Sequence, residues 1–410
     1  MPLTFSRAFS FRLCAIALAF GIAGCVAPKP PAPPPAPVVV APPPPVAGHP
    51  LTGDSSTFLR LPNLDPNQTP VRVGVILPLN SGTQANRTLA GAMLKAAELA
   101  LYDAKNPNIV LMTADEGTKP EDAAAAEGKL LDQGAEVIIG PLFGPSVTAV
   151  APLARDKGVP VLAFSTEKSV AGDGVYLLSF MPQSEVRRVV NYAASQGHHI
   201  FAAMVPQNDY GNVIADAFTD AVKVAGATSV DVEHFAPASN QVMPPSQAIA
   251  KTNADTVMIA EGGPILRAVA PSLGFAGLDK DKVKLLGTGL WDDPSVGRED
   301  MLVGGWFAAP EPEADDAFNG RFHDTFGTNP PQLASLAYDA IALVALLSNG
   351  TPYHRFTQAA LMDPNGFSGI SGIFRFNADG TSERGLAVLE VAPDGFHVVS
   401  PAPKTFQSQS

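Results

Sequence analysis

Short apolar strands and amphipathic helices alternate along residues 71–163, and this order constrains the fold more than any other feature of the sequence. Val71–Leu77 is rich in β-branched and aliphatic residues and stops at Pro78. A strand of this kind is typical of a parallel sheet buried on both faces. Because strands joined by helical crossovers run in one direction, the alternation predicts an α/β fold with a parallel sheet. The other elements expected here are helices over 88–103, 120–133 and 145–156 and strands over 109–112, 137–140 and 159–163.

The same pattern starts again after residue 185, which predicts a second unit of similar construction. Roughly 330 residues follow residue 70, more than one hydrophobic core usually holds, so we expect two Rossmann-like lobes. Residues 368–376 and 386–391 flank the turn-forming Asn377-Ala378-Asp379-Gly380 and predict a C-terminal antiparallel hairpin. The second unit is expected to contain helices over 186–195, 211–225 and 264–273 and near Gln247, with strands over 200–205, 230–235, 254–260 and 283–287.

The N-terminus has the layout of a secretory signal peptide over residues 1–24. Arg7 and Arg12 precede a short apolar segment that ends in Ile22-Ala23-Gly24-Cys25. This ending resembles the lipobox of bacterial lipoproteins, which implies cleavage before Cys25 and acylation of its thiol and new amino group. Val26 stands where that family places an Asp for inner-membrane retention, which implies sorting to an outer membrane. An ordinary secretory signal that happens to contain a cysteine is the alternative.

A proline-rich segment follows, and residues 25–70 are interpreted as a lipid-anchored tether. Twelve prolines lie between Ala27 and Pro50. Proline fixes φ and lacks an N–H, so the segment favours extended polyproline II over helix or sheet. Its reach approaches roughly 140 Å if most of it stays extended. Three roles are compatible with the segment: a passive spacer, a tether that carries a folded domain far from its membrane, or a docking site for a partner.

Composition excludes several classes of function. The net charge of −12 argues against nucleic acid and against a basic surface for anionic lipid, so we expect membrane attachment through the lipid anchor only. The two cysteines are Cys14 and Cys25, so the folded part has no disulfide and no thiolate ligand. The scattered histidines show no metal spacing, and we expect no metal and no cofactor. The apolar run 336–347 contains Tyr338 and Asp339 and indicates a packed helix of a soluble domain.

Four local matches, taken in order, resemble the type I periplasmic binding proteins of the leucine/isoleucine/valine-binding kind. The matching segments are 73–79 with Ser81-Gly82, 137–141, 159–162 with Ser165-Thr166, and 369–377 with Asp379-Gly380. The resemblance implies two lobes joined by three crossings at a hinge, with a ligand in the cleft outside the carboxyl ends of the strands. It places lobe one at about 71–182 and 308–358, lobe two at about 183–307 and 359–400, and a tail at 401–410.

The same resemblance implies cleft residues in lobe one. Asn80 and Ser81 belong to the first ligand loop. Ser165 and Thr166 stand where the family places donors for a ligand carboxylate, although a serine/threonine turn that caps the next helix explains them equally well. After Gly140 the chain has Pro141 and Phe143, in a turn where amino-acid binders often carry serines, so an amino-acid ligand is not assured.

Lobe two carries the remaining candidates. Tyr210 follows a strand and is expected either to cover a ligand or to pack on its own lobe. Glu261, Asp292 or Asp293 could replace the acid that holds a ligand ammonium, since a buried charge needs a paired charge or several hydrogen bonds. Trp291 precedes these aspartates and is included in the cleft.

No nucleophile elbow, phosphate loop or Gly-x-Gly-x-x-Gly motif occurs, so we expect a binding protein and not an enzyme. The favoured hypothesis is a cell-envelope lipoprotein that resembles the penicillin-binding protein activators and regulates a peptidoglycan synthase by protein contact. The alternative is a receptor that delivers an amino-acid-like solute to an ABC importer. A sensor of another small molecule is the third. The long tether and the implied outer membrane favour the first hypothesis.

Overall fold

The first lobe is built on a six-stranded sheet of order β1-β3-β2-β4-β5-β6. The computed structural model describes residues 58–63, 68–236, 238 and 240–407, so Cys25 and the proline-rich segment lie outside the described residues. Strands β2 to β6 pair in parallel, as the alternation predicts, and β1 pairs antiparallel with β3. The strands are β1 (Phe58–Arg60), β2 (Val71–Leu77), β3 (Ile109–Asp115), β4 (Val137–Ile139), β5 (Val161–Ala163) and β6 (Val175–Leu177).

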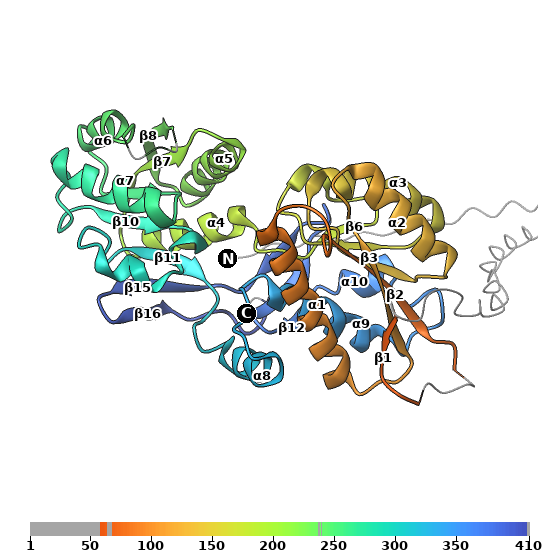
Figure 1. The fold of residues 1–410 in the computed structure, drawn as a ribbon. Helices are drawn as coiled ribbons and strands as arrows, with labels where there is room; N and C mark the ends of the chain where they lie inside the picture. The colour runs from red at the N-terminus through yellow and green to blue at the C-terminus, as the bar shows by residue number, and fades with distance from the viewer. Residues whose placement is uncertain (1–57, 64–67, 237, 239, 408–410) are drawn as a thin grey trace, which may run out of the picture. The chain divides into compact units, whose positions relative to one another are not determined.

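Helices cover both faces of this sheet (Figure 1). On one face, α1 and α9 pack together against β2, with Met93 and Val344 in a shared core cluster. On the other face, α2 and α3 contribute Leu130 and Val147 to a second cluster. The helical elements of this lobe are α1 (Gln84–Ala104), α2 (Pro120–Asp132), α3 (Gly144–Lys157), η2 (Lys168–Val170), α8 (Asp316–Phe326), α9 (Ala334–Leu347) and α10 (Gln358–Leu361).

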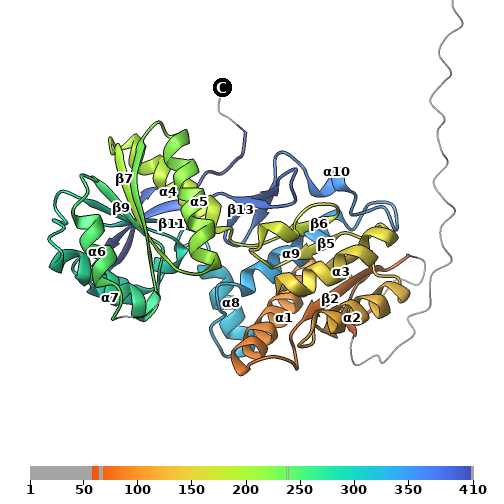
Figure 2. The same ribbon diagram turned by 90° about the horizontal axis from the view of Figure 1, so that it is seen from above.

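The second lobe has a seven-stranded sheet of order β16-β15-β11-β10-β9-β7-β8. Figure 2 shows α4 and α5 on one side of this sheet and α6 and α7 on the other. Its strands are β7 (Ile200–Pro206), β8 (Thr228–Phe235), β9 (Thr256–Ile259), β10 (Lys284–Gly287), β11 (Trp306–Ala309), β15 (Ala387–Ala392) and β16 (Gly395–Ser400). Its helical elements are α4 (Pro182–Ser195), α5 (Asp209–Val224), α6 (Met243–Ala250), α7 (Gly263–Phe275), η3 (Gly289–Trp291) and η4 (Pro294–Arg298).

A third, small sheet corrects the expected hairpin. It contains β12 (Phe367–Gly369), β13 (Gly372–Phe376) and β14 (Ser382–Arg384). The turn after Phe376 leads into β14, whereas 386–391 falls in β15, which pairs with β11 and β16. The physical reason is burial. Leu389 and Val388 of β15 point into two different core clusters, so this strand needs a sheet covered on both faces.

The lobe boundaries also differ from the expected ones near the C-terminus. Residues 359–400 were assigned to lobe two, but Phe367, Phe374 and Phe376 pack in the first lobe's core. The ring centroids of Phe376 and Tyr176 lie 5.2 Å apart, which ties the small sheet to β6. The third crossing therefore lies between β14 and β15. The other two lie between β6 and α4 and between β11 and α8.

A buried polar network occupies the region of these crossings. Arg384 of β14 donates to Asp339 of α9 at 3.1 Å, and the N–H of Ile370 donates to the other oxygen of Asp339 at 2.7 Å. The Arg384 guanidinium also lies over the rings of Phe180 and Phe374, at 4.8 and 5.1 Å from their centroids. Phe180 belongs to the first crossing, so this network holds together segments that are far apart in the sequence.

Candidate functional site

The carboxyl ends of the parallel strands in lobe one carry a connected set of polar groups. After β2, the Ser81 hydroxyl donates to Asp115 Oδ1 at 2.7 Å, and the N–H of Asn80 donates to Asp115 Oδ2 at 2.6 Å. Burial acts to raise the pKa of Asp115, but hydrogen bonds from Gly117, Ser81 and Asn80 outweigh it and lower that pKa. The Ser81 proton is thus committed within the chain, and the exposed Asn80 helps to lower the pKa of Asp115 through both its backbone N–H and its side chain.

The turn that leads into α3 is held by a carboxylate of the chain itself. Glu116, which is fully buried, accepts hydrogen bonds from the N–H groups of Leu142 at 2.9 Å and Phe143 at 3.1 Å. Burial raises the pKa of Glu116, and these bonds oppose the increase. The Phe143 side chain is 39% exposed, and Pro141 is buried. The turn after β4 therefore uses its backbone donors internally, while Phe143 presents a ring to solvent.

A second carboxylate reaches the same helix start. Ser165 accepts a hydrogen bond from the N–H of Glu167 at 3.1 Å, and the hydroxyl of Ser169 donates to Glu167 at 2.7 Å. A Cβ atom on Gly144 would overlap Glu167 Oε2, so glycine makes room for this carboxylate at the first residue of α3. Ser165 forms the turn that was the alternative explanation, and Thr166 is exposed. The Glu167 carboxylate thus lies against the first residue of α3, and Glu167 directly follows the Ser165-Thr166 pair at which the resemblance implied a ligand carboxylate.

In lobe two, the ends of β7 and β10 are joined by a hydrogen bond between the Tyr210 hydroxyl and Thr288 Oγ1 at 3.0 Å. Thr288 is fully buried. Next to it, Glu185 in the first turn of α4 accepts a hydrogen bond from the N–H of Gly289 at 2.9 Å. Burial and the charge of Asp292 raise the pKa of Glu185 to about 7, against the opposing effect of the Gly289 N–H. Three strand or helix ends therefore meet at one polar surface.

Two expected acids complete this surface. The N–H of Gly262 donates to Glu261 Oε1 at 3.1 Å, and burial still raises the pKa of Glu261. Asp292 has an exposed surface, but burial of its carboxyl group and the charges of Asp315 and Asp293 raise its pKa to about 6. In the described part of the chain, no ion pair includes Glu185, Glu261 or Asp292. We name Tyr210, Thr288, Glu185, Glu261 and Asp292 the lobe-two acidic surface.

Asp293 and Trp291 do not belong to that surface. A hydrogen bond from the N–H of Ser295, with Arg267 and Arg298 nearby, lowers the pKa of Asp293. Trp291 was expected in the cleft, but it is fully buried in the core of lobe two and contacts the ring of Phe307 at 6.4 Å between centroids. The reason is the space left by glycines: a Cβ atom on Gly287 would overlap the indole.

Sequence reasoning missed four residues of these sites, namely Glu116, Glu167, Glu185 and Thr288. Thr288 directly follows a predicted strand, and Glu116 follows the strand that ends at Asp115, so position after a strand was an available signal for both. Glu167 lies next to the predicted Thr166. Nothing in the local sequence of α4 marks Glu185, whose partner Gly289 is 104 residues away.

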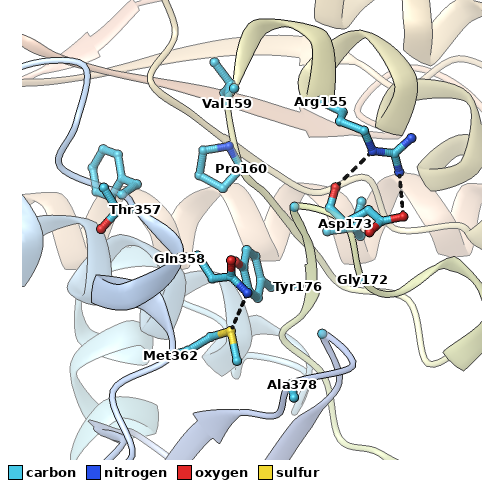
Figure 3. Close-up of a pocket in the computed structure, with 15 residues that line it drawn as sticks. Arg155, Val159, Pro160, Gly172, Asp173, Tyr176, Thr357, Gln358, Met362 and Ala378 are labelled. Carbon is cyan, nitrogen blue, oxygen red and sulfur yellow. Dashed lines mark hydrogen bonds and ion pairs between the residues drawn. The ribbon is translucent and has the colours of Figure 1, made fainter. Parts of the chain in front are cut away.

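A separate pocket of about 410 Å³ lies at the opposite edge of the first sheet, near the amino ends of β5 and β6 (Figure 3). Val159, Pro160 and Met362 give it apolar walls, and Tyr176 and Gln358 add polar groups. An exposed ion pair of 3.7 Å between Arg155 and Asp173 also lines it. The pocket shares no lining residue with the groups that follow the carboxyl ends of the strands.

Among the described residues, no helix has the length and apolarity needed to span a bilayer. No three His, Cys, Asp or Glu side chains of the described residues are placed to hold a metal ion.

Comparison with known proteins gives one family. A model described as periplasmic binding protein matches residues 70–395. A curated relative, an uncharacterized protein of Rickettsia prowazekii (strain Madrid E), is 23% identical over 149 residues, which cover 36% of this chain and 38% of that protein.

Solved structures share the fold. A putative branched-chain amino acid ABC transporter protein from Rhodospirillum rubrum has 17% identity and a TM-score of 0.71, over 80% of this chain and 100% of that one. The substrate-binding protein LivJ of Streptococcus pneumoniae, in complex with isoleucine, has 17% identity and a TM-score of 0.58, over 81% and 100%. A solute-binding protein from Rhodopseudomonas palustris BisB5, in complex with 3,4-dihydroxybenzoic acid, has 18% identity and a TM-score of 0.58, over 81% and 96%.

Proposed function

The chain belongs to the periplasmic binding protein family, and we propose that it binds a small solute between its lobes and serves an ABC importer. This function is the alternative of the sequence analysis. It is supported by the family match and by the solved relatives, which include proteins described as solute-binding or substrate-binding components of ABC transporters. Family membership fits a binding role and not a catalytic one.

One observation carries the proposal: polar groups collect where the parallel strands of each lobe end. This is the edge at which α/β sheets bind ligands. In lobe two, the Tyr210–Thr288 hydrogen bond fixes an aromatic ring and a hydroxyl beside Glu185 and Glu261. Each of these two carboxylates uses one oxygen for a backbone N–H, which leaves the other for a ligand.

The three crossings give the lobes a hinge about which they can close. The Arg384–Asp339 network holds the crossing segments in lobe one. On this proposal, the solute contacts the lobe-two acidic surface and the loops after β2, β4 and β5 in the closed state.

The experiment is thermal unfolding of the purified protein with separate panels of amino acids, amines, aromatic acids and murein peptides. A ligand at 100 times its Kd adds about 2.7 kcal/mol to the free energy of unfolding. For a protein of this size the melting temperature then rises by about 2–4 °C. A hit is followed by titration of Tyr210→Phe, for which we expect weaker binding. If no small molecule raises the melting temperature, the proposal is wrong.

A second candidate is the envelope regulator that contacts a peptidoglycan synthase, as in the penicillin-binding protein activators. One observation favours it: Glu116 takes the backbone donors of the turn after β4, and the Glu167 carboxylate lies against Gly144, so two acids of the chain stand near the loops at which an amino-acid ligand was expected. The test is the rate of a purified peptidoglycan synthase with and without this protein. Stimulation that persists in the Glu185→Gln variant, without any small-molecule binding, supports the regulator.

We further propose a periplasmic location with a lipid anchor at Cys25. The family match supports the periplasm, and the lipobox-like residues before Cys25 support the anchor. Sorting to an outer membrane remains the expectation drawn from Val26. Metabolic labelling with a tritiated fatty acid tests the anchor: Cys25→Ser should abolish the label. Retention of label in that variant excludes lipidation at this cysteine.

A further inference from the structure

We propose that the solute is an organic cation, with an amine or similar positive group and no free carboxylate. This inference rests on the proposed function and names the class of its ligand. It depends on two sets of contacts, one in each lobe, that together set the sign of the charge the site accepts.

The first set is the start of α3. A helix start attracts anions because its N–H groups lack partners and its dipole is positive there. Here Glu116 takes the N–H groups of Leu142 and Phe143, which directly precede the helix, and Glu167 lies against Gly144, its first residue. The attraction is therefore already used by two carboxylates of the chain. A ligand carboxylate placed beside Gly144 would meet the negative charges of Glu116 and Glu167. The N–H groups of Leu142 and Phe143 would not be free to bind it.

The second set is the lobe-two acidic surface. Glu185, Glu261 and Asp292 have no cationic partner among the described ion pairs. The two glutamates are nonetheless held in place by the N–H groups of Gly262 and Gly289. Fixed carboxylates without a counter-charge are costly in a partly buried place unless a cation joins them. An ammonium group has three donors and no acceptor, so it matches such a set.

Tyr210 adds to the fit. Its ring lies beside Glu185 and Glu261, whose charges both act on its hydroxyl, and that hydroxyl is hydrogen-bonded to Thr288. An aromatic face next to carboxylates attracts an organic cation through its quadrupole. The combination of ring, hydroxyl and acids favours an organic cation over a bare metal ion.

The experiment compares three probes that share one branched alkyl chain: leucine, 3-methylbutylamine, which is leucine without its carboxylate, and 4-methylpentanoate, which lacks the amine. Isothermal titration of the whole protein measures each Kd, and 1,4-diaminobutane, Mg²⁺ and Ca²⁺ are run alongside. We expect the amine to bind at least tenfold more tightly than leucine, and the carboxylate not to bind.

Variants locate the effect. Glu185→Gln and Glu261→Gln should each weaken amine binding at least tenfold, whereas Asp281→Asn, an exposed acid near the amino end of β10, should not. Glu167→Gln should reduce the ratio of the Kd for leucine to the Kd for the amine. Its control is Asp173→Asn, an exposed acid in the same lobe at the opposite sheet edge. Circular dichroism confirms that each variant is folded.

Proton linkage gives an independent readout. Glu185 faces Asp292, Tyr210 and the Gly289 N–H, and Asp292 faces Asp315 and Asp293, with Arg384 acting on Asp315. The pKa values of about 7 for Glu185 and about 6 for Asp292 mean that these acids lose protons when a cation binds. Amine affinity should therefore rise between pH 5.5 and pH 7.5, which are chosen to bracket these values, and the rise should shrink in Glu185→Gln.

The outcomes separate this inference from the function on which it rests. If leucine or 4-methylpentanoate binds more tightly than the amine, the inference of a cationic ligand is wrong, but the proposed function of solute receptor stands. The same conclusion follows if only an uncharged solute binds, or if Mg²⁺ or Ca²⁺ binds and no amine does. If neither these probes nor the wider panel binds, both proposals fall.

Discussion

Arg384 in β14 and Asp339 in α9 form an ion pair of 3.1 Å in which the side chains are only 2% and 0% exposed. Two of the guanidinium nitrogens, Nε and Nη1, have no hydrogen-bond partner among the described residues. The aromatic rings of Phe180 and Phe374 flank the guanidinium instead. The charge of each partner is thus balanced mainly by the other, which makes this pair sensitive to the loss of either member.

We predict that Arg384→Met lowers the free energy of unfolding by about 3–5 kcal/mol, because it leaves Asp339 buried without its counter-charge. Adding Asp339→Asn should recover part of that loss, since the amide oxygen can still accept the Ile370 N–H. Urea unfolding of both single variants and the double variant gives the coupling energy. If the loss in free energy of unfolding of the double variant equals the sum of the losses of the two single variants, the pair does not act as a unit.

Glu127 in α2 provides a pH-dependent prediction. Its side chain is fully buried, neither oxygen has a hydrogen-bond partner among the described residues, and burial raises its pKa to about 8. Because the folded pKa exceeds the unfolded one, the folded protein retains this proton longer, and stability falls as pH rises from about 4.5 to about 8. In Glu127→Gln this part of the decrease should disappear, with a gain on the order of a few kcal/mol at pH 9.

The measurement for Glu127 is the urea midpoint at pH 5, 7 and 9. Glu121→Gln is the matched control, because Glu121 is an exposed acid in the first turn of the same helix. Equal pH profiles for the wild type and Glu127→Gln would mean that Glu127 is not the titrating group.

The Tyr210–Thr288 hydrogen bond should stabilise lobe two independently of any ligand. Tyr210→Phe and Thr288→Val should each cost about 1 kcal/mol, and the double variant should cost less than their sum because both remove one bond. Chemical unfolding of the ligand-free protein measures this cycle. Tyr102→Phe, at a tyrosine that is 53% exposed, should change stability by less than about 0.5 kcal/mol.

Trp291 distinguishes a core residue from a ligand contact. Because the indole is fully buried, Trp291→Phe should cost about 2 kcal/mol of stability through the space it leaves. It should leave the Kd for 3-methylbutylamine within about twofold of the wild-type value, a shift well below 1.4 kcal/mol. Phe143→Leu, at a ring exposed beside the start of α3, should have the smaller effect on stability. A large loss of affinity in folded Trp291→Phe would return the tryptophan to the binding site.

The alternation of strands and helices could be predicted because the central strands are buried on both faces. Every residue of Val71–Leu77 is buried, and the strand is apolar apart from Arg72. The short strands β6 and β14 could not be predicted, since a strand of three residues carries no periodicity. The predicted hairpin partner of β13 was wrong because the apolar run 386–391 is a stronger local pattern than the three residues of β14.

The candidate site divides in a similar way. Tyr210, Glu261 and Ser165 directly follow strands or open the helices after them, and strand ends can be located from sequence. The position of Trp291 depends on the room beside Gly287, which exists only in the folded core. The partners of Glu116 and Glu185 are backbone N–H groups, whose direction is set by the tertiary fold and leaves no mark in the sequence.

The three crossings also set the order in which the molecule can be completed during its synthesis. The core of lobe one needs Phe374 and Phe376, and the sheet of lobe two needs β15 beside β11. A growing chain that has not reached Ala387 therefore carries β11 as an open strand edge, which is prone to pairing with other chains. Neither lobe is finished until β13 and β15 have emerged, so the two lobes are completed almost together.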